Sequence, residues 1–140
     1  MTTRRTAVAG MVAAMMLGLT AAGTAAPTTP SAVDAAPGES YKRTELYFGG
    51  NRPDGTVITP VQFELFLDEE VTPAFPDGLT WLPAHGQWMG GKESSYLLIL
   101  LYPQNNRQAN REIEEIRTDY KSQFQQQSVL RADSTDRVSF

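Results

Sequence analysis

The stretch Tyr96–Tyr102, YLLILLY, decides how this chain folds. Seven apolar or aromatic residues follow one another here without a charge, and Pro103 comes directly after them. Seven residues are too few to cross a bilayer as a helix. A short apolar run that is bounded by turn residues is typical of a strand buried on both sides. We therefore predict that Tyr96–Tyr102 is a central strand of a sheet.

Two more strands are predicted upstream of it. Residues 43–49, RTELYFG, alternate between apolar and polar side chains, which is typical of a strand with one buried face. Leu46 and Phe48 would face the core, and Glu45 and Tyr47 would face away from it.

The second upstream strand is Leu79–Trp88, LTWLPAHGQW, which contains Pro83 and Gly86. Because proline cannot donate a hydrogen bond within a sheet, we place this strand at a sheet edge.

A first helix is predicted from Thr59, directly after a loop rich in glycine and proline. Thr59 can cap this helix, Pro60 suits its first position, and Gln62 completes a capping box. Its apolar stripe consists of Phe63, Phe66, Leu67 and Val71.

A second helix is predicted to begin near Asn106 or Asn110, since both are good N-caps. Its core positions fall at helical spacing and are Ile113, Ile116, Tyr120 and Phe124. We then expect a short strand at Ser128–Ala132, a turn at 133–136 and a final extended piece at 137–140.

The order strand, helix, strand, strand, helix, strand is that of the ferredoxin-like fold. We therefore predict an α+β protein in which both helices cover one face of a four-stranded antiparallel sheet. The other face would be open. The residues that we expect on this open face are Glu45, Tyr47, Tyr96, Leu98 and Leu100. An exposed apolar patch of that size on a monomer is typical of a surface that binds a partner or a ligand.

The N-terminus has the features of a secretory signal peptide. Arg4 and Arg5 precede the uncharged apolar run Ala7–Leu19, and small residues follow at Ala21–Ala26. We place the cleavage site after Ala25, and both the general and the twin-arginine export route remain open. The mature protein would be secreted or extracytoplasmic.

Three segments are predicted: a signal peptide at 1–25, a disordered linker at 26–40, and a single domain at 41–140. The linker is rich in proline, alanine, serine and threonine. The remaining length is that of one domain.

The composition excludes several classes of function. The chain has no cysteine, so it has no disulfide, no thiol nucleophile and no lipid-modified cysteine. Removal of Arg4 and Arg5 with the signal peptide changes the formal net charge from −4 to −6. Because basic residues do not cluster, we do not expect nucleic acid or an anionic membrane as a partner. No second apolar stretch is long enough to anchor the mature chain in a membrane.

Several segments together resemble a family of small exported bacterial proteins of unknown function. In order, they are VTPAFPDGLT at 71–80, GQW at 86–88, YKSQFQQQSVL at 120–130 and VSF at 138–140. The resemblance extends over 44–140. Members of the family often carry an anchoring cysteine in the signal region, and an arginine where Ala74 and Met89 stand here. The resemblance implies no activity, and no functional residue is carried over from it.

The single histidine, His85, could act as a general base near neutral pH. We favour the simpler interpretation, an exposed histidine on an edge strand. One histidine without cysteine does not suffice for the usual zinc ligand sets, so we expect neither a metal nor another cofactor.

Gln87 and Trp88 could form the wall of a ligand site, although we favour packing of Trp88 on the core. Glu45, Tyr47 and Glu93 could converge on the open face, where one carboxyl group would have a raised pKa.

Two hypotheses of function follow from these observations. We favour a binding or interaction module outside the cytoplasm that forms a homodimer through its open sheet face, with or without a small apolar ligand between the subunits. The alternative is a small cofactor-independent enzyme of the isomerase or oxygenase type with its site on that face. The residues to test for it are His85, Glu45, Tyr47, Gln87 and Trp88.

Overall fold

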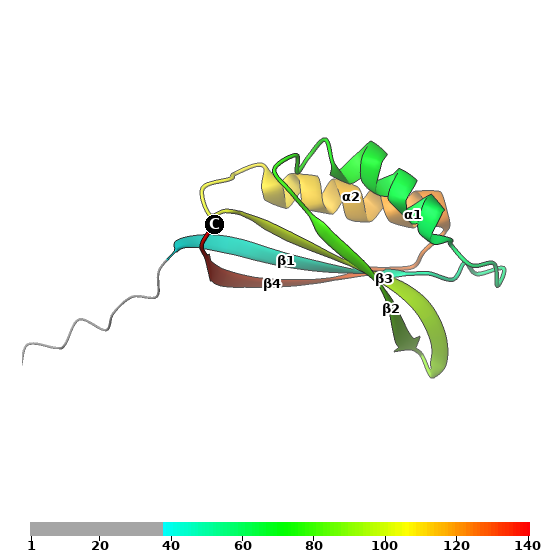
Figure 1. The fold of residues 1–140 in the computed structure, drawn as a ribbon. Coiled ribbons are helices and arrows are strands. Elements are labelled where there is room, and N and C mark those ends of the chain that lie inside the picture. Colours follow the sequence, from blue (N-terminus) through cyan, green and yellow to red (C-terminus); the bar gives the residue numbers. More distant parts are fainter. Residues whose placement is uncertain (1–37) are drawn as a thin grey trace, which may run out of the picture. The chain divides into compact units, whose positions relative to one another are not determined.

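The computed structural model describes residues 38–140. The predicted signal peptide and most of the predicted linker lie outside these residues. The elements follow one another in the predicted order (Figure 1). They are β1 (Glu39–Gly49), α1 (Pro60–Phe66), the π-helical turn η1 (Leu67–Val71), β2 (Thr80–Trp88), β3 (Gly91–Pro103), α2 (Ala109–Phe124) and β4 (Val129–Val138).

The four strands form one antiparallel sheet in the order β2-β3-β1-β4. Both helices lie over the same face of this sheet (Figure 1). The predicted ferredoxin-like α+β fold is therefore confirmed. The strand order also confirms that β3 is an inner strand and that the proline-containing strand β2 lies at an edge.

The helix-covered face carries the even-numbered residues of β1 and β3. Leu46 and Phe48 of β1 are buried there, as predicted. The register pairs Leu46 with Leu98 and Phe48 with Tyr96, so Tyr96, Leu98 and Leu100 are buried there too. The expectation that these three residues lie on the open face is wrong.

The open face is the sheet face opposite the helices, and it carries the odd-numbered residues of β3. The large apolar residues among them are Leu97, Ile99 and Leu101, which are all partly exposed. β3 is therefore buried on one side within a single copy of the chain, and the expected burial on both sides is wrong. The reason is that none of the described helices packs on the second face.

The start of α1 confirms the predicted capping box. The backbone N–H of Gln62 donates to the Thr59 hydroxyl at 3.3 Å, and the backbone N–H of Thr59 donates to the Gln62 side chain at 3.0 Å. Two N–H groups that a helix leaves unpaired are thus satisfied. All four residues of the predicted apolar stripe are buried.

The helix α2 begins at Ala109 with Gln108 at its N-cap position, and the predicted cap Asn106 lies two residues before that position. The Asn106 side chain accepts hydrogen bonds from the backbone N–H groups of Gln108 and Ala109. The predicted core positions of this helix are all buried.

The strand β4 is longer than predicted. It runs through 133–136, where we expected a turn, and pairs with β1 up to Val138. Two polar contacts explain the difference: Asp133 accepts a hydrogen bond from Thr44 at 2.6 Å, and Asp136 lies 3.6 Å from Arg43. Pairing with β1 therefore overrides the local turn preference of these polar residues.

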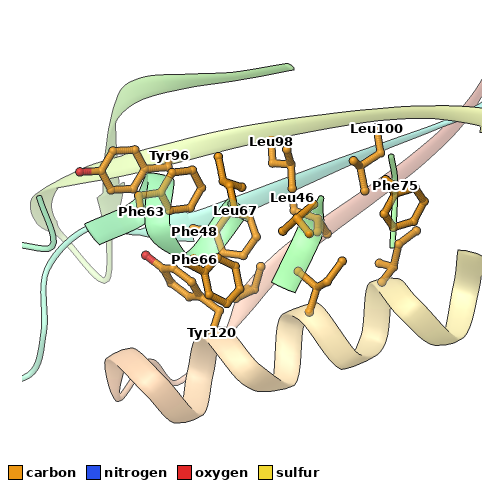
Figure 2. Packing of buried hydrophobic residues seen from close by; sticks show 14 of the residues in the cluster. Leu46, Phe48, Phe63, Phe66, Leu67, Phe75, Tyr96, Leu98, Leu100 and Tyr120 are labelled. Carbon is orange, nitrogen blue, oxygen red and sulfur yellow. The ribbon is translucent and has the colours of Figure 1, made fainter. Parts of the chain in front are cut away.

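The core is rich in aromatic side chains (Figure 2). Phe63 of α1 stacks on Tyr96 of β3 with ring centroids 4.3 Å apart, and Phe48 packs against Tyr120 of α2 at 4.5 Å. The buried hydroxyl groups have partners, since Tyr96 donates to the carbonyl of Ile58 and Tyr120 to that of Gly49. These bonds hold the loop after β1 against the core.

Candidate ligand-binding site

A hollow of about 370 Å³ lies at one end of the sheet, where β1 and β2 end and β3 and β4 begin. Tyr47 of β1, Gln87 and Trp88 of β2, Glu93 of β3 and Gln126 of the α2–β4 loop all line it. Its size is within the range of small-molecule sites. We refer to it as the terminal hollow.

Two glycines make room for the terminal hollow. Gly49 of β1 and Gly86 of β2 flank the start of β3, on the open face. A Cβ atom on Gly49 would lie 2.6 Å from Oε1 of Gln126 and 3.7 Å from Oε2 of Glu93. A Cβ atom on Gly86 would lie 4.0 Å from Oε1 of Glu93. The Glu93 carboxylate therefore stands between two strands that have no side chain beside it.

The Glu93 carboxylate has no hydrogen-bond or ion-pair partner among the described residues, although it is partly buried. It is therefore an acceptor that is available to a ligand.

The Gln126 side chain presents a second acceptor. Its Nε2 donates to the carbonyl of Asn51 at 2.9 Å and to that of Phe124 at 3.1 Å. Because two carbonyl groups hold the nitrogen, the oxygen Oε1 is turned toward Gly49. Both acceptors thus meet near the position that a side chain on residue 49 would fill.

Glu45 and Tyr47 are adjacent on the open face and are joined to each other. The Tyr47 hydroxyl donates to Glu45 at 2.6 Å, and Arg43 donates to the same carboxylate at 2.6 Å and 2.9 Å. The hydrogen bond from Tyr47, followed by that from Arg43, lowers the pKa of Glu45, whereas donation to Glu45 raises the pKa of Tyr47. A raised pKa at Glu45 is therefore wrong, and Tyr47 stays protonated.

His85 does not line the terminal hollow. It lies opposite Ser94 on the other side of the β2–β3 hairpin, where it is exposed beside Gln87 and Lys92. The structure therefore brings Tyr47, Trp88 and Glu93 together and separates His85 from them, whereas Gln87 borders both the terminal hollow and the surface beside His85.

Trp88 is 56% exposed, so packing of this residue on the core is wrong. Its role as the wall of a ligand site stays a prediction.

Sequence reasoning missed the contributions of Gly49, Gly86 and Gln126. The three glutamines at 125–127 directly follow the predicted core positions of the second helix, and their residue type alone indicates no site. In the structure Gln125 adopts a left-handed conformation with φ 57°, which ends α2 and turns Gln126 toward Asn51. A polar residue directly after a helix end is the one signal that pointed to this position.

The described residues contain no cluster of three or more histidine, cysteine, aspartate or glutamate side chains that could hold a metal ion. No helix within 38–140 is long and apolar enough to span a membrane.

Comparisons with known proteins identify a family and a fold. The family model described as "Protein of unknown function (DUF3574)" matches residues 43–140. No curated protein matches the chain.

Among solved structures, the chain is similar to a phage SAM lyase in complex with S-methyl-5′-thioadenosine. The two share 13% sequence identity with a TM-score of 0.54, and the match covers 77% of this chain and 97% of that chain. A second similar structure is the phage SAM lyase in its apo state, with 10% identity and a TM-score of 0.47, over 71% of this chain and 90% of that chain. At 13% identity the first of these two similarities shows a shared fold alone.

Proposed function

We propose that this chain, which belongs to the DUF3574 family of proteins of unknown function, is a binding module. In this proposal it forms a homodimer through its open sheet face. The same proposal includes export: the signal peptide is cleaved after Ala25, and the mature protein is extracytoplasmic. N-terminal sequencing of protein recovered outside the cytoplasm tests this second part, and an intact Met1 there would contradict it.

One observation carries the proposal of a homodimer. The register aligns four side chains in a row across all four strands of the open face: Leu82, Leu97, Tyr47 and Leu130. Leu101 of the same face is 40% exposed, and Leu130 is 63% exposed. With Ile99, these residues form an apolar surface that we call the open-face patch. A contiguous patch of this kind on a monomer is typical of an interaction site.

A second copy of the chain suits this patch in size. Four strands spaced ~4.8 Å apart, with about nine paired residues each at ~3.3 Å per residue, present a face of roughly 600 Å². Two such faces bury roughly 1,200 Å², which is the lower end of the range of stable interfaces. A flat face that packs on its own copy around a two-fold axis is the commonest arrangement of homodimers.

Arg43 forms ion pairs on the open face. Arg43 lies 2.6 Å from Glu45 and 3.6 Å from Asp136, so this basic group already has acidic partners within its own chain. Arg43 therefore neutralises only one of these two acidic groups, and the attraction to a second copy comes from the open-face patch rather than from charge.

Light scattering coupled to size-exclusion chromatography tests the dimer. We expect the mature protein to be a dimer at micromolar concentration, and Leu82→Glu to be a monomer with an unchanged circular dichroism spectrum. Leu65→Glu is the matched control, because Leu65 is exposed on α1, away from the open face. A wild-type monomer up to 100 µM, or a dimeric Leu82→Glu variant, would overturn the proposal. A monomer that binds an apolar dye at this face would assign the patch to a small apolar ligand instead.

A cofactor-independent enzyme with its site on the open face is the second candidate. The observation that favours it is the terminal hollow, which combines two titratable side chains, Glu93 and Tyr47, with Gln87 and Trp88. A protein of the same fold is a SAM lyase, which makes SAM a first substrate to test. Loss of SAM that depends on Glu93 would support this candidate, and equal loss with Glu93→Gln would contradict it.

A further inference from the structure

We propose that the terminal hollow binds a small organic cation, a protonated primary amine, with its ammonium group between the Glu93 carboxylate and Oε1 of Gln126 and its carbon chain against Trp88. This site goes beyond the proposed dimer, because all of its residues come from one copy of the chain.

The first argument concerns the two acceptor oxygens that lie beside Gly49 in the terminal hollow. The two side-chain oxygens closest to Gly49 are both acceptors: a Cβ built on residue 49 would lie 2.6 Å from Oε1 of Gln126 and 3.7 Å from Oε2 of Glu93. An ammonium group has three donors and no acceptor. A ligand that donates to both oxygens would restore the partners that the carboxylate lacks within the described residues.

The second argument is that the nearby cations are directed elsewhere. Arg52 lines the hollow, but its guanidinium lies 5.4 Å from the centre of the Phe124 ring and donates to the carbonyl of Val57 at 3.4 Å. Lys92 precedes Glu93 in β3, so strand alternation directs it to the opposite side of the hairpin. Neither residue neutralises Glu93, and an organic cation can therefore take that place.

The third argument is the aromatic wall. Trp88 is more than half exposed at the rim of the hollow, where a tryptophan buries little of its apolar surface. Indole is the aromatic side chain that attracts cations most strongly. The Tyr47 ring also lines the hollow, and its hydroxyl group is already donated to Glu45, which leaves the ring as the part available for contact.

Nuclear magnetic resonance of the ¹⁵N-labelled mature protein tests the site with three probes of the same chain length: butylamine, 1-butanol and butyrate. At pH 7 butylamine is a cation, 1-butanol is neutral and butyrate is an anion. We expect butylamine to shift the signals of Glu93, Gln126 and the Trp88 indole in a saturable way. The other two probes should leave these signals in place.

Two variants separate the site from general charge effects. Glu93→Gln should weaken butylamine binding at least tenfold, while Glu64→Gln, which removes the same charge from the exposed side of α1, should leave it unchanged. Gly49→Ala should also weaken binding, because the new methyl group would displace Gln126. Equal affinity in Glu93→Gln and Glu64→Gln, equal binding of 1-butanol, or no saturation by butylamine up to 50 mM would overturn the proposal.

The dimer proposal can fail without affecting this one. The Leu82→Glu variant lacks a patch residue but keeps every residue of the hollow named here. We expect it to bind butylamine at least as tightly as the wild type, because Tyr47 belongs both to the hollow and to the open-face patch that a dimer would cover. Loss of binding in this variant would show that the hollow alone does not form the site.

Discussion

The backbone of Met89 adopts a left-handed conformation that glycine and asparagine usually occupy. It forms the two-residue turn between β2 and β3 with Gly90, and the φ angles of the two residues are 49° and 84°. Positive φ at both positions is typical of a type I′ turn, in which Asn-Gly is preferred. The Met89 side chain is 91% exposed, so no packing offsets the backbone strain.

Met89→Asn should therefore stabilise the protein by about 0.5–1 kcal/mol, since asparagine tolerates the left-handed region better. Urea unfolding measures the difference in the free energy of unfolding. Met89→Val is the opposite control and should destabilise, because a β-branched side chain fits positive φ poorly. A Met89→Asn variant no more stable than Met89→Val would show that this turn stores no strain.

At the residue scale, the residue types that suit a ligand site could be predicted from the sequence, but the places of these side chains in space could not. Tyr47, Gln87, Trp88 and Glu93 were candidates by residue type, and all four line the terminal hollow. Gln126 was not a candidate, because its place depends on the backbone turn at the end of α2 and on two carbonyl groups from other parts of the chain. No periodicity in one sequence reveals such a contact.

At the scale of elements, the start of α1 depends on a few local bonds. This helix has seven residues before the π-helical turn, so it has few internal hydrogen bonds of its own. Thr59→Ala removes the capping hydroxyl and should cost about 1 kcal/mol of stability. Thr59→Ser keeps the hydroxyl and should cost less. Thermal unfolding measures the midpoints of both variants, and equal midpoints for Thr59→Ala and Thr59→Ser would contradict a capping role.

Glu114 connects α2 to β4, and it makes stability depend on pH. It accepts hydrogen bonds from Arg131 of β4 at 2.8 Å and from Arg117 at 2.7 Å. The hydrogen bond from Arg131, followed by that from Arg117, lowers the pKa of Glu114 below its usual value of 4.5. A carboxyl whose pKa is lowered by folding stabilises the folded state above its usual pKa, and this contribution is lost as the pH falls through the lowered value.

Glu114→Gln should therefore destabilise the protein at pH 7 and have a smaller effect at an acidic pH below the lowered pKa of Glu114. Denaturant unfolding at the two pH values measures this. Glu115→Gln is the control, because the Arg111–Glu115 pair is exposed on both sides and is expected to contribute little. The same loss at both pH values would contradict the argument.

The elements themselves were largely predictable because their signals are local. The capping box of α1 and the helical spacing of the core residues of α2 identified both helices. The face of β3 was not predictable, since a continuous apolar run such as YLLILLY has no alternation to show which residues point to the helices. Only pairing with β1, where Leu98 lies opposite Leu46, decides it.

At the scale of the whole molecule, the sheet has two inner and two outer strands. β1 and β3 pair on both sides, whereas β2 and β4 pair on one side only. Hydrogen–deuterium exchange should therefore be slowest at residues 44–48 and 96–100, which pair and also lie beneath the helices. It should be fastest in the hairpin at 86–92. Equal protection of the hairpin and of β1 would contradict this order of local stability.

The pairing of Glu39 with Val138 brings the beginning of β1 and the end of β4 to the same pole of the sheet (Figure 1). The terminal hollow lies at the opposite pole, about nine strand residues or ~30 Å away. A carrier protein or bead attached directly before Glu39 or after Phe140 would therefore leave the hollow facing away from the attachment point. The same proximity allows a circular permutant in which a short bridge joins the two ends and the chain is reopened at Met89–Gly90.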